Sequence, residues 1–134
     1  MSQENVDIVR RVIASATDGD FETMLALHDP NWEGFIPEAY PVAGTWRGLD
    51  GVRGFVEEWL DAWNAFRIDP EEFIDGGDAV VAVVRYWGRG RGSGVEVTDR
   101  WFYAYRLRDR RVVSWRLCGS RAEALEAVGL NGRA

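Results

Sequence analysis

One histidine is the side chain of this sequence best suited to acid–base chemistry. His28 is the only residue that titrates near neutral pH without a perturbing environment. With Phe21 and Met24 it shares the apolar face of a short predicted helix over residues 21–28. An imidazole on a core-facing surface can act as a general base or hydrogen-bond a ligand. The structural alternative is a satisfied imidazole near a helix C-terminus, where the helix dipole favours the protonated form.

Phenol groups on the predicted strands could donate hydrogen bonds to a ligand oxygen. Tyr86, Tyr103 and Tyr105 lie in segments rich in β-branched and aromatic residues. A phenolic O–H can stabilise an oxygen on which negative charge develops. We take Tyr103 as a catalytic candidate beside His28, with Tyr86 as the other possible donor. For all three tyrosines the alternative is ordinary packing of an amphipathic ring.

Two carboxylates near the histidine could also act as bases. Burial in an apolar pocket would raise the pKa values of Asp29 and Glu33 toward neutrality. Alternation from Trp32 predicts instead that Glu33 points outward. Asp29 precedes Pro30, a pair that is typical of a turn. His28 is therefore the first candidate for the base, with a carboxylate as the alternative.

Large rings are the main candidates for ligand contacts. Seven tryptophans in 134 residues need a roomy interior or a buried interface. Trp59 and Trp63 are predicted one turn apart on a helix, where they could meet Trp101 or Trp115. A flat ligand and simple core packing explain these rings equally well. The predicted ligand contacts, which include a candidate lid residue at position 40, are Trp32, Tyr40, Trp59, Trp63, Tyr86, Trp101, Trp115 and Leu117.

Metal and phosphate chemistry lack their usual motifs in this sequence. No His and Cys cluster has the spacing of metal ligands, so we expect no metal site. The glycine-rich stretch over residues 88–94 joins two strands and lacks the Gly-Lys-Ser/Thr ending of a phosphate loop. Cys118 ends a strand with no general base in view, which predicts a buried, unreactive thiol.

Three consecutive segments predict the sheet that positions these residues. Residues 79–87, 95–107 and 112–118 read as an antiparallel meander. If the arginines of these strands point outward, the inner face carries aromatic rings, some of which end in a hydroxyl group. That inner face would carry Ala82, Val84, Tyr86, Trp101, Tyr103, Tyr105, Leu107, Val113, Trp115 and Leu117. A short first strand over 32–36 and an edge strand over 67–74, interrupted by Pro70, complete the sheet.

Apolar periodicity predicts helices over residues 4–17, 21–28, 49–66 and 120–129. Asp20 can cap the second helix, and Ser120 with Glu123 forms a capping box at the last. Residues 37–48 are predicted as an irregular loop. We expect one α+β domain over residues 1–134, in which three helices of the N-terminal half cover a curved, mostly antiparallel sheet and leave a cone-shaped hollow.

Composition narrows the classes of partner. A net charge of −6 argues against nucleic acid or an anionic membrane surface as a partner. No apolar run approaches the roughly 20 residues that a membrane span needs. The polar N-terminus carries no signal-peptide pattern. A single cysteine excludes an internal disulfide and favours a cytoplasmic location.

Six segments resemble a known family. They read NVDIVRR at 5–11, GDFE at 19–22, HDPNWE at 28–33, WRGLDGV at 46–52, RLRDRRV at 106–112 and EALEAVGL at 123–130. With them the chain resembles the NTF2-like (nuclear transport factor 2) superfamily, in its SnoaL-like and ketosteroid-isomerase-like group. The resemblance implies a cone-shaped half-barrel with an apolar pocket, and a homodimer formed through the outer sheet face. It also implies cofactor-independent chemistry: double-bond isomerisation, aldol cyclisation or epoxide hydrolysis.

The catalytic carboxylates of these enzymes have no intact counterpart here. The family's cyclases place an aspartate at the position of Leu117, and its ketosteroid isomerases place one at the position of Gly34. The family's epoxide hydrolases use a set of two aspartates and an arginine. Here Asp99 and Arg100 are adjacent in the sequence, so their side chains should face opposite ways. Two hypotheses remain open. One is an isomerase, cyclase or hydrolase that transfers protons on a small apolar or polyketide-like molecule; the other is a non-catalytic ligand-binding or dimeric interaction domain.

Overall fold

The computed structural model describes residues 2–40 and 42–130, so residue 41 of the predicted loop lies outside it. Within these residues the helices are α1 (Ser2–Asp18), α2 (Phe21–Ala26), α3 (Gly48–Ala62) and α4 (Arg121–Ala127). The strands are β1 (His28–Ile36), β2 (Gly44–Arg47), β3 (Trp63–Asp75), β4 (Ala79–Gly90), β5 (Glu96–Arg108) and β6 (Arg111–Cys118). They form one sheet in the order β2-β1-β6-β5-β4-β3. Every neighbouring pair is antiparallel except β1 and β6.

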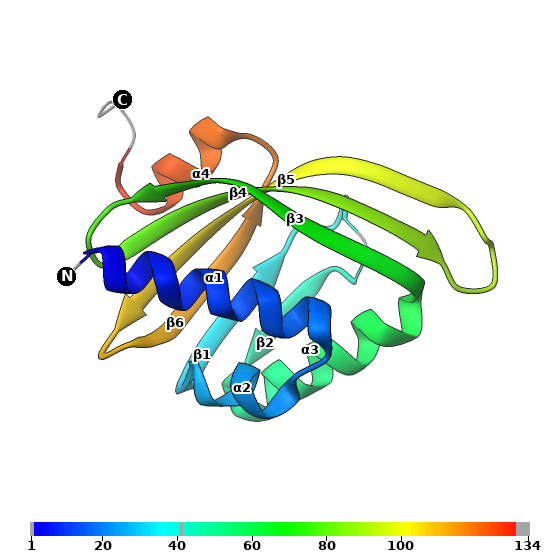
Figure 1. Cartoon of the computed structure of the whole chain (residues 1–134), viewed down its shortest axis with the longest axis horizontal. Coiled ribbons are helices and arrows are strands. Elements are labelled where there is room, and N and C mark those ends of the chain that lie inside the picture. The colour runs from blue at the N-terminus through cyan, green and yellow to red at the C-terminus, as the bar shows by residue number, and fades with distance from the viewer. Residues whose placement is uncertain (1, 41, 131–134) are drawn as a thin grey trace.

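The helices lie on two sides of this curved sheet (Figure 1). α1 packs on β3 and β4, and α3 packs on β1, while α4 packs on the opposite face of β4, β5 and β6. The larger apolar core lies between the sheet and α1, α2 and α3, and a smaller one lies beneath α4. The predicted α+β class, with helices of the N-terminal half roofing a mostly antiparallel sheet, is confirmed. No helix in the described part of the chain combines the length and apolar character needed to span a bilayer.

The predicted end of the third helix was wrong because strand pairing overrides local periodicity. α3 ends at Ala62, and Trp63 adopts an extended backbone with φ −119° and ψ 131°. Trp63 and Phe66 therefore belong to β3, where they pair with Gly90 and Gly88 of β4. The spacing of these rings fits a helical stripe, but aromatic residues suit a sheet at least as well.

The histidine also lies on a different element from the one predicted. α2 ends at Ala26, and His28 is the first residue of β1, paired with Val112 of the parallel strand β6. The Val112 N–H donates to the Leu27 carbonyl at 2.8 Å, so strand pairing begins immediately after the helix. A further short strand, β2, forms inside the predicted loop by pairing with β1.

Bulges set which residues face the core. The register of β3 shifts between Pro70 and Glu72, which confirms the predicted irregularity at this proline on an edge strand. A second shift leaves Val113 of β6 unpaired opposite the step from Arg106 to Leu107. Val112 therefore enters the core in place of Val113, contrary to the strict alternation predicted from the sequence.

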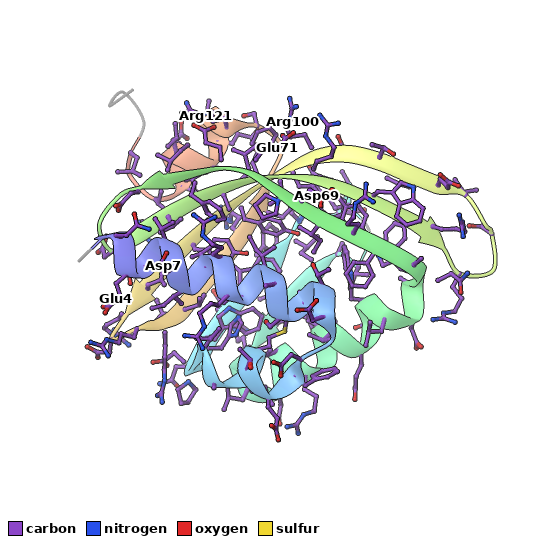
Figure 2. All side chains as sticks on the ribbon, in the orientation of Figure 1. Glu4, Asp7, Asp69, Glu71, Arg100 and Arg121 are labelled. Atoms are coloured by element: carbon purple, nitrogen blue, oxygen red, sulfur yellow. The ribbon has the colours of Figure 1, made fainter. Side chains whose placement is uncertain are left out.

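The extra residue of the β3 bulge neutralises an unfavourable pair on the outer face. Arg85 and Arg100 lie directly opposite each other on β4 and β5. Glu71 contacts both, at 3.3 Å from Arg85 and 2.7 Å from Arg100. Figure 2 labels Glu71 and Arg100. Like charges facing each other across strands are destabilising, so the glutamate between them relieves their repulsion.

An arginine of the β4–β5 hairpin caps α3. The Arg91 guanidinium donates to the carbonyls of Leu60, Asp61 and Trp63, at 3.1 to 3.2 Å. Its backbone N–H donates to the Ala62 carbonyl at 2.9 Å. The last carbonyls of a helix lack partners within the helix, and the dipole favours a cation there. Arg91 therefore fastens the long hairpin to the end of α3.

Arg91→Ala should lower the free energy of unfolding by about 1 kcal/mol, because carbonyls at the end of α3 lose a charged donor that is itself solvent-exposed. Arg53→Ala is the matched control, since Arg53 is an exposed arginine of α3 with no ion pair in the described residues. Urea unfolding followed by circular dichroism measures both. Equal losses for the two variants would contradict the capping role.

Candidate functional site

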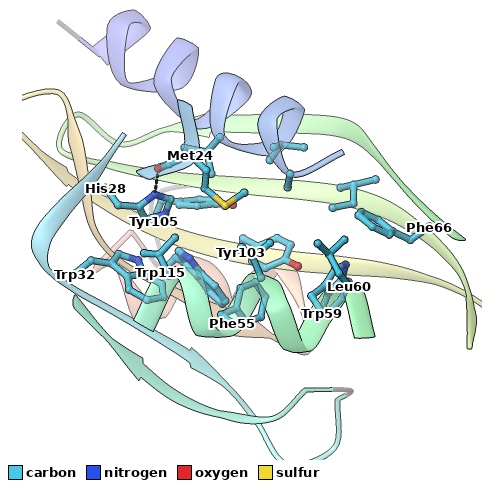
Figure 3. Close-up of a pocket in the computed structure, with 16 residues that line it drawn as sticks. Met24, His28, Trp32, Phe55, Trp59, Leu60, Phe66, Tyr103, Tyr105 and Trp115 are labelled. Atoms are coloured by element: carbon cyan, nitrogen blue, oxygen red, sulfur yellow. Dashed lines mark hydrogen bonds between the residues drawn. The ribbon is translucent and has the colours of Figure 1, made fainter. Parts of the chain in front are cut away.

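A small cavity lies between the inner face of the sheet and the three roofing helices (Figure 3). Its volume is about 70 Å³. The lining side chains come from α1, α2, α3, β1, β3, β5 and β6: Val12, Ile13, Ala16, Met24, His28, Trp32, Val52, Phe55, Val56, Trp59, Leu60, Phe66, Ile68, Tyr103, Tyr105 and Trp115. The lining holds no acidic residue, no lysine and no arginine, so the cavity is almost entirely apolar.

His28 is the only titratable base on this lining, and it is 4% exposed. Its Nδ1 lies 2.6 Å from the Met24 carbonyl oxygen (Figure 3). A carbonyl only accepts, so Nδ1 carries the proton in this contact. Burial lowers the pKa of His28, with the Met24 hydrogen bond opposing the shift. The imidazole is therefore neutral at pH 7, and its Nε2 lone pair has no partner among the described residues.

Two tyrosines bring hydroxyl groups to the cavity, whose lining also includes the indole of Trp32, with a buried N–H that has no partner among the described residues. Tyr103 and Tyr105 are both on the inner face of β5, with ring centroids 5.9 Å apart. Burial raises the pKa of each phenol, so both remain protonated at neutral pH. Within the described chain neither hydroxyl has a hydrogen-bond partner. Each can therefore donate to a ligand oxygen without first breaking a protein contact.

The carboxylates considered as bases lie elsewhere. Glu33 points outward and forms an ion pair with Arg47 at 2.7 Å. Asp29 accepts a hydrogen bond from the Asn31 N–H at 2.8 Å, the arrangement of a local turn. Among residues 2–40 and 42–130, no group of three or more His, Cys, Asp or Glu side chains is placed to hold a metal ion.

The eight residues predicted to contact the ligand divide into two sets. Trp32, Trp59 and Trp115 line the cavity together with His28 and Tyr103. The other five do not line it: Tyr40, Trp63, Tyr86, Trp101 and Leu117.

Packing explains the second set. The Tyr86 and Trp101 rings stack with centroids 4.0 Å apart, and Trp59 lies against both. Trp63 closes this cluster at 5.3 Å from Tyr86. Tyr40 meets Trp101 edge-to-face at 6.1 Å. Leu117 is buried in the same core. These rings fill one end of the hollow and leave the cavity beside His28.

Trp32 explains why the first strand carries glycine at position 34. A Cβ atom built on Gly34 would lie 2.3 Å from Cζ2 of Trp32, a distance that real contacts essentially never show. The Trp32 indole therefore occupies the volume into which a side chain at position 34 would project. Its ring meets His28 edge-to-face at 5.4 Å and Trp115 at 5.7 Å. An aspartate at position 34 and this indole cannot share the site.

Sequence reasoning did not name several lining residues as ligand contacts. The sequence places Met24 on a helix face and offers Tyr105 only as one of three possible donors, and it marks neither Phe55 nor Leu60 as a ligand contact. The helical stripe of α3 did signal that Phe55 faces the core. Nothing in the sequence indicates which part of that stripe faces open space.

Lowering the pH should destabilise the protein through His28. The unfolded residue has a pKa near 6.5, whereas burial lowers the pKa in the folded state. As the pH falls below about 6.5, the unfolded chain binds a proton that the folded chain resists, and stability falls by at most about 1.4 kcal/mol per pH unit. Urea unfolding at pH 7 and pH 5 should show a larger loss for the native sequence than for His28→Gln. Parallel losses in both proteins would contradict this origin.

Known proteins resemble this chain in sequence and in structure. A family model described as a SnoaL-like domain matches residues 9–115. An NTF2-like protein from Burkholderia xenovorans is 30% identical, with 88% of this chain and 90% of that chain covered and a TM-score of 0.78. TerC, co-crystallised with polyporic acid, is 23% identical, with 94% and 98% covered and a TM-score of 0.78. A candidate SnoaL-like polyketide cyclase from Jannaschia sp. is 20% identical, with 96% and 90% covered and a TM-score of 0.78. None of the curated proteins matches this chain.

Proposed function

Because the chain belongs to the SnoaL-like family of the NTF2-like fold, as its sequence predicts, we propose that its single domain binds a small uncharged organic molecule beside His28 and moves a proton on it. Membership of this family agrees with a protein that has a pocket for a small molecule. The observation that carries the finer proposal is His28 Nε2, a basic atom with no partner among the described residues, in a lining without charged side chains. An apolar lining without charged residues favours a neutral ligand, since a charged one would lose its hydration without a partner.

The proposed proton transfer uses two kinds of polar group on the lining, the imidazole of His28 and the tyrosine hydroxyls. His28 Nε2 would take a proton from a carbon next to a ligand carbonyl, leaving an enolate and an imidazolium. The Tyr103 hydroxyl would donate a hydrogen bond to the enolate oxygen, with Tyr105 as its neighbour. The imidazolium then returns the proton to the same carbon or to a conjugated one. Return to a different carbon is an isomerisation, and no metal or organic cofactor takes part.

Cyclohexanone tests this chemistry, because it is neutral, has one ring and exchanges its α-hydrogens through an enol. In D₂O, proton NMR should show faster exchange with the native protein than with buffer. His28→Gln should reduce the enzymatic rate by about 100-fold or more, and Tyr103→Phe by about 10-fold. Tyr86→Phe should leave the rate unchanged, since that hydroxyl lies outside the cavity.

The same experiment separates the two hypotheses for this family member. Binding of cyclohexanone without accelerated exchange would favour a non-catalytic ligand-binding domain. A large loss of stability in His28→Gln, with an unchanged exchange rate, would assign His28 to structure. TerC supports small-molecule binding in this fold, because it was crystallised with polyporic acid, although its 23% identity establishes only a shared fold.

We also propose that two copies pair through the outer sheet face, as the family resemblance implies. On this face, beside the end of α4, lies a hollow of about 270 Å³. Its lining includes Arg106, Arg116 and Glu33, and the glutamate is already paired with Arg47. Neither of the two lining arginines forms an ion pair within the described residues, whereas Arg85 and Arg100 share Glu71. An acidic group of a second copy would supply the missing partner. The buried thiol of Cys118 further supports a reducing compartment, and we propose the cytoplasm.

Size-exclusion chromatography with light scattering should give twice the 15.2 kDa mass of one chain. Arg116→Glu should shift the protein toward the monomer, because it reverses a charge at the proposed interface. Arg53→Glu makes the same change on α3, away from this face, and should leave the mass unchanged. A native protein that elutes as a monomer at high concentration would overturn the pairing.

A further inference from the structure

The cavity beside His28 is too small for a ring in its present shape. Its volume is about 70 Å³. For comparison, an engineered cavity of about 150 Å³ in another protein holds one benzene molecule. If the protein binds an organic ligand, as proposed above, some lining side chains must therefore move. The structure indicates which ones.

The cavity adjoins a second hollow near the contact between α2 and α3. This second hollow, of about 10 Å³, lies on the other side of the cavity wall there, beside the turn between α1 and α2. The two spaces share four lining residues: Ala16, Met24, Val56 and Leu60. These side chains are thus in contact with the cavity on one side and with a surface hollow on the other.

Leu60 stands out among the four because it is 38% exposed, and it is one of three large hydrophobic residues of the described chain that are at least 36% exposed. It lies in the last turn of α3 and points into the space between α3 and the sheet (Figure 3). An exposed apolar side chain at the rim of an apolar cavity can rotate outward with little loss of packing.

Met24 is the other movable residue of this wall. Its unbranched side chain has three rotatable bonds, so it can adopt a new shape at small cost. Its backbone is held in place, because the Met24 carbonyl accepts the Nδ1 hydrogen bond of His28 at 2.6 Å. The side chain can therefore swing while the histidine keeps its orientation.

We infer that Met24 and Leu60 form the mouth of the cavity and determine the size of ligand that reaches His28. The inference rests on the proposed function, since it concerns the ligand of the same site. The rings of Trp59, Tyr86 and Trp101, by contrast, pack against one another and cannot yield as easily. A ligand would thus enter between α2 and α3, and its width would be limited by these two side chains.

Nitrobenzene and 1-nitronaphthalene test this inference as neutral probes of one and two rings that quench tryptophan fluorescence. Stopped-flow mixing should show that the native protein binds the one-ring probe at least about 10-fold more tightly than the two-ring probe. Leu60→Ala should speed association of both probes and bring the two affinities within about 3-fold of each other. Leu60→Phe should slow association. Met24→Ala should act as Leu60→Ala does if it remains folded.

Leu49→Ala is the matched control. Leu49 lies on the same helix and is 36% exposed, close to the value for Leu60, but it does not line the cavity. It should leave the rates and affinities of both probes unchanged. If nitrobenzene binds but Leu60→Ala and Leu60→Phe behave like Leu49→Ala, the mouth lies elsewhere and this inference is overturned while the proposed function stands. If neither probe binds to any of these proteins, the proposed function fails and the mouth fails with it.

Discussion

The hydrogen bond from His28 Nδ1 to the Met24 carbonyl is the interaction on which the candidate site depends. Burial alone would keep the imidazole neutral but would not determine which nitrogen carries the proton. The carbonyl decides this, because it can only accept, and so Nε2 keeps its lone pair. Met24 lies near the end of α2 and His28 opens β1, so the short helix-to-strand junction fixes the ring. Strand pairing of β1 with β6 in turn holds that junction against the sheet.

Trp32 imposes the second constraint, since it decides which groups can share the site. Its indole fills the space of a side chain at position 34, so this position cannot hold a carboxylate base. The site therefore contains a neutral imidazole where a carboxylate would place a fixed negative charge. If His28 takes a proton, the enolate and the imidazolium form together as an ion pair in an apolar space. Tyr103 and Tyr105 remain protonated and can stabilise the anionic half of that pair.

The sequence predicts the faces of this fold better than it predicts the open space. Alternation placed Tyr86, Tyr103 and Tyr105 on the inner surface, and all three are buried there. It could not tell that Tyr86 would stack on Trp101 while Tyr103 lines the cavity, because position along the hollow depends on the register between β4 and β5. Periodicity also failed at Trp63, since a ring spaced to suit a helical face suits the inner face of a strand as well.

Aromatic packing and cavity volume are linked in this fold. Trp59, Tyr86 and Trp101 pack against one another with centroids 4.0 to 5.8 Å apart, so moving any one of them disrupts contacts with the others. Met24 and Leu60 carry no ring, and Leu60 is partly exposed to solvent. Expansion of the cavity should therefore occur on the side of α2 and α3 and leave the stacked cluster in place. In the proposed expansion, these packed rings would keep their positions while the side chains of Met24 and Leu60 would move to admit a ligand.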